Sequence, residues 1–410
     1  MPPKKKAEKK KADTVVKTVN DQFEAQLAEL GLGNALKLAD EYDNDVECVT
    51  TGFPGLDRAI GGENPDHYGL PKRRHSELYS KKEGAGKTST ALCIGVTWQQ
   101  HKLKVAVISI EEDVTPNYMR MLGYITDKAE ADALGLYAVR LLKPQVKVED
   151  CETDMVYVDQ VLDLVGKAAN IFDLVIIDSA DALVSETEAE QSSGDNVQPG
   201  GIARKLKAFM RKNSSKRAHC LWLNHASVKI GQSGPPSYYT YGGKAIPRYS
   251  SLRFELTVIK KLAENDEADP YGFVTQIKLV KNRLGPNWRY VNLTYIFGEG
   301  FSKEYDYFET ALKLDIVTKV GGWFYRLGDG KNLDERKKNA AWKCQGKFNT
   351  YKMLRADPER LAEIKQLING EDVEPEVGVD LGDEAAVAAA EADDQELIPP
   401  EAEPLDGHNA

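Results

Sequence analysis

Residues 77–90, ELYSKKEGAGKTST, join a short apolar run to a loop of small residues and the triplet Gly86-Lys87-Thr88. Bare backbone in this loop lets successive N–H groups surround a phosphate, and a following helix offers its positive N-terminal end to the same anion. Lys87 is then expected to reach the β- and γ-phosphates, and Thr88 to ligate magnesium. The sequence therefore predicts a phosphate-binding loop. Its expected nucleotide contacts are Glu83, Gly84, Ala85, Gly86, Lys87, Thr88 and Ser89.

One position of this loop departs from the strict motif, which begins with Gly. Lys81 stands there, so the turn from strand to loop must accept a side chain. If that turn needs a left-handed backbone, Lys81 costs about 1–2 kcal/mol relative to Gly. The alternative is a plain glycine turn followed by an exposed lysine. It is disfavoured because strand, loop and helix occur in the order that phosphate binding needs.

A second apolar strand ends in a carboxylate. Residues 172–178, FDLVIID, are β-branched and apolar, which is typical of a strand buried on both faces of a parallel sheet. At the carboxyl edge of such a sheet, Asp178 is expected beside the magnesium ion that Thr88 ligates, where it holds a metal-bound water. Alone this pattern is weak evidence, because Asp also favours the turns that follow strands. It becomes stronger evidence because this strand follows a predicted phosphate-binding loop in the sequence.

Acidic residues also end the apolar run of residues 105–113, VAVISIEED. A carboxylate at this place can orient or deprotonate the water that attacks the γ-phosphate. Because neighbouring side chains of a strand point to opposite faces, Glu111 and not Glu112 is expected to be catalytic. The alternative is a solvated acidic cap at the end of a strand.

Two polar residues, Asn224 and His225, follow the apolar part of residues 219–230, HCLWLNHASVKI. Such a pair can hydrogen-bond to the γ-phosphate or its water and report hydrolysis to the Gly/Pro/Tyr-rich stretch beyond. We therefore expect His225 to act in the catalytic site. A histidine at a strand end is more often structural than catalytic, so that alternative remains open.

Taken in order, these segments resemble the RecA-type homologous recombinases, with this chain as a divergent member. The likeness covers about residues 46–330. Its segments are VECVTTGFPGLDRAIGG at 46–62, GLP at 69–71, EEDVTPNYMRMLG from 111, DSADAL from 178, GG at 242–243, VKNR at 280–283, GEG at 298–300 and GGWF at 321–324. The resemblance implies an α/β fold. It has a RecA-like P-loop ATPase core with a mostly parallel central sheet, an N-terminal helical arm and a small C-terminal α/β domain.

The resemblance also implies an activity and its partners. It implies a DNA-dependent ATPase that uses ATP and Mg²⁺, with Tyr118 stacking on adenine. The enzyme forms a helical filament on single-stranded DNA and catalyses homologous pairing and strand exchange with duplex DNA, aided by mediator or single-strand-binding proteins. Lys281 and Arg283 match the basic pair that reaches the neighbouring subunit's γ-phosphate. The expected compartment is the cytoplasm of a bacterium or of a phage-infected cell.

Two stretches fit the DNA-binding loops that the resemblance implies. Residues 186–200 are polar and precede a helix with five cations, which suits phosphate binding, although a solvated basic helix face is the alternative. Residues 226–243 mix Gly and Pro with tyrosines that can stack on bases. The residues expected at DNA are Pro199, Gly200, Arg204, Arg211, Ser227, Lys229, Ile230, Gly242 and Gly243.

Three residues depart from the family pattern. His225 stands where the family usually has Gln at its switch position, so the coupling of hydrolysis to DNA is expected to differ. Pro247 and Arg248 replace a basic residue and an aromatic interface residue, which indicates a rebuilt subunit contact.

The charge of the chain is unevenly distributed. The net charge is −10, but residues 371–410 hold fourteen Asp or Glu and no Lys or Arg, so the remainder is close to +4. Such a tail buries too little apolar surface to fold. It either competes with DNA for the basic surface or simply confers solubility. Five scattered cysteines, at 48, 93, 151, 220 and 344, are expected to be reduced.

We expect five regions along the chain. They are a basic flexible tail (1–16) without a signal peptide, an oligomerisation helix (17–45), the ATPase core with the DNA-binding loops (46–300), a small C-terminal domain (301–370) and the acidic tail (371–410). No apolar run approaches ~18 residues, so no membrane span is expected. Two other classes share the loop: a hexameric RecA-fold helicase, and an assembly protein that binds nucleotide only structurally.

Overall fold

The computed structural model describes residues 46–111, 113–144, 157–184, 201–213, 216–228, 238–263 and 269–370, together with Gln26 and Glu29. The chain divides into a small unit, Met1–Val46, and a large one, Glu47–Ala410. Gln26 and Glu29 are helical. Outside the described residues lie both predicted tails, the rest of the N-terminal helix, and Cys151, Pro199, Gly200, Lys229 and Ile230. Among the helices that are described, none combines the length and apolar character that a membrane span needs.

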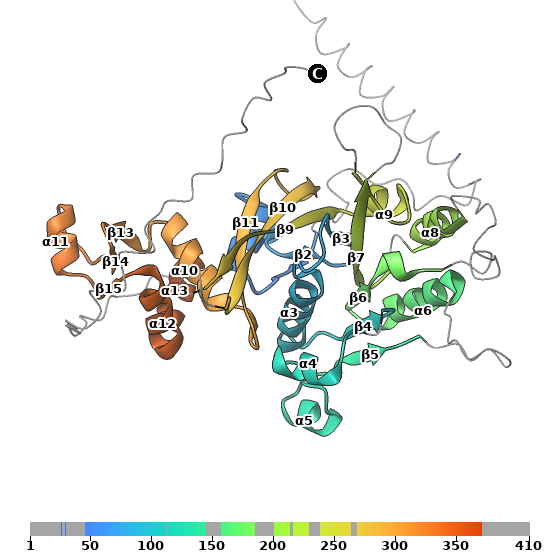
Figure 1. Cartoon of the computed structure of the whole chain (residues 1–410), viewed down its shortest axis with the longest axis horizontal. Helices are drawn as coiled ribbons and strands as arrows, with labels where there is room; N and C mark the ends of the chain where they lie inside the picture. Colours follow the sequence, from blue (N-terminus) through green and yellow to red (C-terminus); the bar gives the residue numbers. More distant parts are fainter. Residues whose placement is uncertain are drawn as a thin grey trace, which may run out of the picture. The chain divides into compact units, whose positions relative to one another are not determined.

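Ten strands form the central sheet, in the order β12-β11-β10-β9-β3-β7-β6-β4-β5, with β8 paired to β7 (Figure 1). Strands β9, β3, β7, β6, β4 and β5 run parallel to one another, β10 to β12 continue the sheet in antiparallel fashion, and β8 is antiparallel to β7. This confirms the predicted mostly parallel sheet. Its strands are β3 (His75–Ser80), β4 (Val105–Ser109), β5 (Arg140–Leu142), β6 (Leu174–Asp178), β7 (His219–Val228), β8 (Tyr238–Thr240), β9 (Leu252–Leu262), β10 (Gly272–Asn282), β11 (Tyr290–Ile296) and β12 (Gly300–Phe301).

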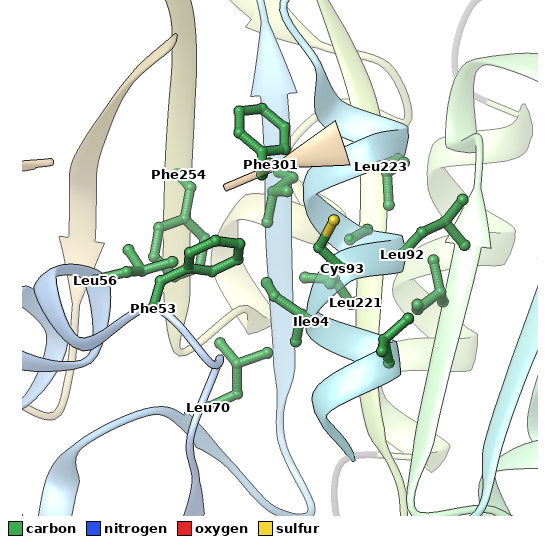
Figure 2. Packing of buried hydrophobic residues seen from close by; sticks show 14 of the residues in the cluster. Phe53, Leu56, Leu70, Leu92, Cys93, Ile94, Leu221, Leu223, Phe254 and Phe301 are labelled. Atoms are coloured by element: carbon green, nitrogen blue, oxygen red, sulfur yellow. The ribbon is translucent and has the colours of Figure 1, made fainter. Parts of the chain in front are cut away.

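Helices cover both faces of the parallel strands, as the continuous apolar character of those strands requires. On one face, α3 packs into a cluster with Leu92, Ile94, Leu223 and Phe254, which Figure 2 shows with Phe301 beside it. On the other face, α6, α8 and α9 pack on the alternate side chains of the same strands. The helices of this part are α2 (Pro54–Gly61), α3 (Lys87–Gln100), α4 (Pro116–Met121), α5 (Lys128–Ala133), α6 (Val158–Ile171), α8 (Gly201–Lys212) and α9 (Ala245–Tyr249), with short turns η3 (Pro65–His67) and η4 (Ala180–Ala182) and a separate pair of strands, β1 (Cys48–Val49) and β2 (Leu70–Pro71).

Helix α3 is buried over most of its length. Every residue from Thr90 to Gln99 is buried, because the sequence TALCIGVTWQ is apolar on all sides of the helix and not along one stripe. Helix α6, by contrast, buries a single face through Val158, Val161, Leu162 and Val165. Burial on all sides fixes α3 in place, and with it the loop from which α3 starts.

A smaller antiparallel sheet and four helices follow the core. They have their own apolar cluster, which includes Phe308, Phe324, Trp342, Leu354 and Ile364. These elements are α10 (Lys303–Lys313), β13 (Thr318–Val320), β14 (Trp323–Arg326), β15 (Trp342–Gln345), α11 (Leu333–Lys338), α12 (Lys347–Ala356) and α13 (Pro358–Ile368). The predicted small C-terminal α/β domain therefore has its counterpart here.

Helix α10 is attached to α2 of the core by a buried carboxylate. The Gly55 backbone N–H donates to Asp306 Oδ2 at 2.8 Å, and the Asp306 side chain is almost completely buried. Burial raises the pKa of Asp306 to about 7, while the hydrogen bond from Gly55 acts in the opposite direction. The contact is therefore sensitive to pH.

Replacing Asp306 with Asn tests this sensitivity. A carboxyl whose pKa is higher in the folded than in the unfolded chain contributes most to stability below the unfolded value of about 4, and loses that contribution as the pH rises toward 7. The Asp306→Asn variant keeps an oxygen for Gly55 but does not titrate. The free energy of unfolding, measured in urea, should fall between about pH 4 and pH 7 by less in the variant than in the parent. The difference between the two falls should be roughly 1–4 kcal/mol. Equal pH dependence of the two proteins would contradict the account.

Candidate functional site

Four adjacent parallel strands end at one edge of the sheet and bring the predicted ATPase residues together. In the order β3, β7, β6, β4, these strands lead to Lys87, His225, Asp178 and Glu111, respectively. His225 is the register partner of Ser80, the last residue of β3. In an open α/β sheet, ligands bind outside the carboxyl ends of the strands. The sequence-predicted residues therefore lie where a ligand is expected.

The loop between β3 and α3 has the bare backbone that its glycines predict. Gly84 and Gly86 have φ values of +70° and +80°, a region that side chains rarely adopt. At Gly86 a Cβ atom would also lie 2.8 Å from Phe301 Cζ, whereas at Gly84 it would meet nothing within 4 Å. The carbonyl of Ala85 accepts from Thr275 Oγ1 at 3.1 Å, which attaches the loop to β10.

Lys81 lies in this loop without backbone strain. The described non-glycine residues with positive φ are Arg73, Lys102, Trp288 and Asp315, so Lys81 is not left-handed. The condition under which Lys81 would cost energy relative to Gly is therefore not met. Its ammonium group instead lies 2.6 Å from Glu255 Oε1 on β9.

Lys87 is the first residue of α3, and its ammonium group points at the strand ends. Its Nζ atom donates to Ser80 Oγ at 2.9 Å and lies 2.7 Å from His225 Nε2. An ammonium that donates to Nε2 requires a neutral imidazole with its proton on Nδ1. Burial lowers the pKa of Lys87, while nearby carboxylates, chiefly Asp181 and Asp178, raise it. A phosphate at this position would favour the charged form of the lysine.

Thr88 and Asp178 supply adjoining oxygen atoms beside Lys87. Thr88 Oγ1 donates to Asp178 Oδ2 at 2.8 Å across the gap between α3 and β6. Burial raises the pKa of Asp178 to about 6, and the Thr88 hydrogen bond partly offsets this. Among the described residues, no group of three or more His, Cys, Asp or Glu could hold a metal. One carboxylate and one hydroxyl nevertheless suit Mg²⁺, which takes its remaining ligands from phosphates and water.

Glu111 lies two residues beyond β4 and shares a serine with a second carboxylate. The Ser179 hydroxyl is within hydrogen-bond distance of both Glu111 Oε1 and Asp181 Oδ1, and it donates to one of them at a time. The Ile110 N–H donates to the Asp178 carbonyl at 2.6 Å, which extends the pairing of β4 and β6 to the residue before Glu111. Glu112 lies outside the described residues.

Tyr118, on α4, lies near the start of α3. Its hydroxyl is 2.6 Å from Ser89 Oγ and 3.4 Å from Tyr295 OH. Burial raises the pKa of Tyr118 well above its ordinary value, so the group is a neutral phenol. Ser89 and Tyr118 were both predicted to contact the nucleotide, and the structure brings them together.

Lys281 and Arg283 do not reach this site within one chain. Lys281 and Asn282 pair with Arg253 and Leu252 at the start of β9, next to the beginning of β3. The phosphate loop follows the opposite end of β3. Lys281 Nζ instead donates to the carbonyls of Pro247 and Arg248 at 2.9 and 3.1 Å, and both of these residues depart from the family pattern. Burial and the neighbouring Arg283 lower the pKa of Lys281 to about 8.

The predicted DNA-binding residues that are described lie on α8, on β7 and in the turn after β8. Arg204 and Arg211 are exposed on α8, which buries its opposite face, and Ser227 is exposed on β7. Gly242 and Gly243 have φ values of +76° and +66°. At Gly242 a Cβ atom would lie 2.4 Å from Leu206 Cδ1, so this glycine lets the turn after β8 pack on α8. The two candidate DNA segments are thereby joined.

Sequence reasoning missed three residues that complete the site. Ser80 and Ser179 contact Lys87 and Glu111, and Tyr295 contacts Tyr118. A polar residue directly after Asp178 was a usable signal for Ser179. No local pattern marks Tyr295, because it reaches Tyr118 from a strand 177 residues away in sequence.

Comparison with known proteins shows the same likeness along most of the chain. Residues 16–302 match the family described as the RecA N-terminal domain. The chain is 30% identical to Protein RecA of Synechocystis sp. over 365 residues, which cover 87% of this chain and 92% of the relative. It is 31% identical to Protein RecA of Pseudarthrobacter chlorophenolicus, covering 84% of this chain and 89% of the relative. Protein RecA of Nautilia profundicola is 30% identical, with 95% of this chain and 98% of the relative covered.

The close approach of Phe301 to the phosphate loop is testable with two glycine substitutions. Gly84→Ala adds strain from its positive φ alone, about 1–2 kcal/mol. Gly86→Ala adds similar strain and also displaces Phe301, which we expect to cost roughly 1–3 kcal/mol more. Urea unfolding of both variants measures the difference. Equal losses of stability would mean that Phe301 does not restrict the loop.

Proposed function

The chain belongs to the RecA family, and from this premise we propose how its residues divide the work of a recombinase. It is a DNA-dependent ATPase that uses ATP with Mg²⁺, forms a filament on single-stranded DNA and catalyses strand exchange with duplex DNA in recombination and repair. The observation that carries the assignment of roles is the meeting of Lys87, Thr88, Asp178 and Glu111 at one sheet edge.

The phosphate loop and the start of α3 bind the triphosphate. The backbone N–H groups of residues 83–89 face the β-phosphate, and Lys87 turns from His225 to the β- and γ-phosphates. Thr88 holds Mg²⁺ directly, and Asp178 holds it through a water molecule. The 2.8 Å distance between Thr88 Oγ1 and Asp178 Oδ2 supports this assignment, because it places both oxygens at one position. Bound Mg²⁺ neutralises charge on the phosphates during transfer.

Glu111 positions the water that attacks the γ-phosphate. Its carboxylate lies beside Asp178 at the neighbouring strand end, and the Ser179 hydroxyl holds one of its oxygens. That leaves the other oxygen to accept a proton from water. General-base assistance of this kind contributes about 10²–10⁴-fold to a rate. His225 is the second polar group at the γ-phosphate, and its 2.7 Å contact with Lys87 supports a role in sensing whether the site is filled.

Tyr118 packs against the adenine base. Its ring lies next to the first turn of α3, and its hydroxyl is already engaged by Ser89 and Tyr295. The part of the ring that is not packed on the core remains for a ligand, and aromatic faces stack on bases.

Lys281 and Arg283 act on the ATP of the neighbouring subunit. Their place at the opposite edge of the sheet from their own phosphate loop supports this assignment, because they cannot serve the site of their own chain. A head-to-tail contact that repeats without closing produces a helical filament. The ATP site is then complete only between two subunits.

DNA is bound along the side of the filament that carries α8 and β8. Arg204 and Arg211 contact the backbone with Lys229, Ile230 separates bases, and Pro199, Gly200, Ser227, Gly242 and Gly243 shape the loops. The packing of Gly242 on Leu206 supports joint movement of the two segments. We further propose the five regions given above, with residues 17–45 as an oligomerisation helix, and a cytoplasmic location.

A mixing experiment tests the shared site. Glu111→Gln and Lys281→Ala should each lose single-stranded-DNA-dependent ATP hydrolysis. In a mixed filament, a Lys281→Ala subunit still supplies Glu111, and a Glu111→Gln subunit still supplies Lys281. Random mixing of equal amounts should therefore rebuild about one interface in four, because contacts in a head-to-tail filament have a direction. Phosphate release at about a quarter of the parent rate is expected.

The control is a mixture of Lys281→Ala with Arg283→Ala, which both damage the same half of the site and leave the phosphate loop intact. No mixture of these two variants can restore an intact interface. Absence of recovery in the first mixture, while both variants still coat single-stranded DNA, would contradict the shared site.

A further inference from the structure

A line of polar side chains crosses the sheet face opposite α3, beside the phosphate loop. Glu77 and Tyr79 point to this face because Leu78 between them lies in the apolar cluster on the α3 side. Their register partners on β9 are Arg253 and Glu255. Polar residues on two adjacent strands thus face one another across the β3–β9 pair.

These side chains contact one another in sequence. Glu77 is completely buried and accepts from Arg253 Nε at 2.5 Å and from Asn224 Nδ2 at 3.0 Å. The Arg253 guanidinium carbon lies 4.8 Å from the ring centre of Tyr79. The Tyr79 hydroxyl then donates to Glu255 Oε2 at 3.0 Å. One oxygen of Glu255 is therefore already bound.

The other oxygen of Glu255 leads to the phosphate loop. Lys81 Nζ lies 2.6 Å from Glu255 Oε1, and the same ammonium lies 4.7 Å from the ring centre of Tyr238 on β8. The network thus connects Lys81, which stands where the strict loop motif has Gly, to Tyr238, the first residue of β8.

The opposite end of the network, at Asn224, also contacts the segment that begins with Tyr238. Asn224 Oδ1 accepts from the Tyr241 N–H at 3.1 Å, and Asn224 Nδ2 donates to the Tyr241 carbonyl at 3.1 Å. Segment 238–241 is therefore bound at both ends by one network, through the Tyr238 ring and through the Tyr241 backbone. Asn224 is also the neighbour of His225, which contacts Lys87.

We propose that Lys81 is a positioning residue that holds β8 in place for DNA binding; this rests on the function proposed above. Glu255 is 15% exposed on its side chain and is fixed by Tyr79, so Lys81 finds a preset partner. A strand held in its binding geometry costs less to order when single-stranded DNA is bound. Lys81 acts through Tyr238 and does not itself touch DNA.

The energetic effect of this contact is modest. The Lys81 side chain is 40% exposed, and a cation–π contact at such a site changes an equilibrium by about two- to five-fold. Lys82 is the matched comparison, because it is an exposed cation in the same loop and pairs with no acidic residue that the structure describes. Loss of charge alone would affect both lysines equally.

The test measures binding of full-length protein to single-stranded DNA of uniform sequence, with a non-hydrolysable ATP analogue, at several salt concentrations. Lys81→Ala should weaken binding about two- to five-fold, with the same salt dependence as the parent. Lys81→Arg should restore the affinity, because a guanidinium both pairs with a carboxylate and stacks on an aromatic ring. Lys82→Ala should bind like the parent.

Three results would overturn the inference while the parent binds DNA normally. They are unchanged affinity of Lys81→Ala, an equal loss for Lys82→Ala, and a salt slope that falls by about one in Lys81→Ala. The last result would mean that Lys81 contacts a DNA phosphate directly. A parent protein that does not bind single-stranded DNA with the analogue would overturn the proposed function, and this inference with it.

Discussion

The common direction of four neighbouring strands is the constraint on which the site depends. Strands β3, β7, β6 and β4 are parallel, so their carboxyl ends meet at one edge, and residues far apart in sequence become neighbours. Helix α3 is buried from Thr90 to Gln99, and its first turn begins at that edge. The hydrogen bond from Thr88 to Asp178 joins the helix to the sheet.

Burial gives the site an electrostatic preference for its ligands. It lowers the pKa of Lys87 and raises the pKa of Asp178 to about 6, since the charged form of either group is poorly solvated there. In the proposed site, a phosphate would stabilise the cationic form of Lys87, and a divalent cation would stabilise the anionic form of Asp178. Each ligand would therefore offset the cost of burying one charge, the phosphate at Lys87 and the cation at Asp178. This explains why nucleotide and Mg²⁺ suit this edge together.

Much of the fold and of the candidate ATP site could be predicted from sequence because the signals are local. An apolar run that ends in a polar residue marks both a buried strand and its exposed end, which is how Asp178 and Glu111 were found. Contacts between distant segments carry no such signal. Tyr295 reaches Tyr118, and Lys81 reaches Glu255 and Tyr238, only through the register of the sheet. The possible backbone strain at Lys81 likewise depended on a φ angle that the sequence does not specify.

The family resemblance supplied what neither pattern nor composition could. Lys281 and Arg283 have no signature as site residues, and within one chain they lie at the wrong edge of the sheet. Their assignment requires a second subunit. The DNA-binding residues were predicted from loop composition and from the resemblance, and four of them, Pro199, Gly200, Lys229 and Ile230, lie outside the described residues. Roles there remain proposals.

The central claim is that nucleotide held by Lys87 at a subunit boundary organises the DNA-binding segments. Strand exchange by the Lys87→Ala variant, measured with homologous single-stranded and duplex DNA in the presence of ATP and Mg²⁺, tests it most directly. We expect the variant to form no ATP-dependent filament and no exchanged product. Parent-like coating of single-stranded DNA together with parent-like exchange would contradict the account.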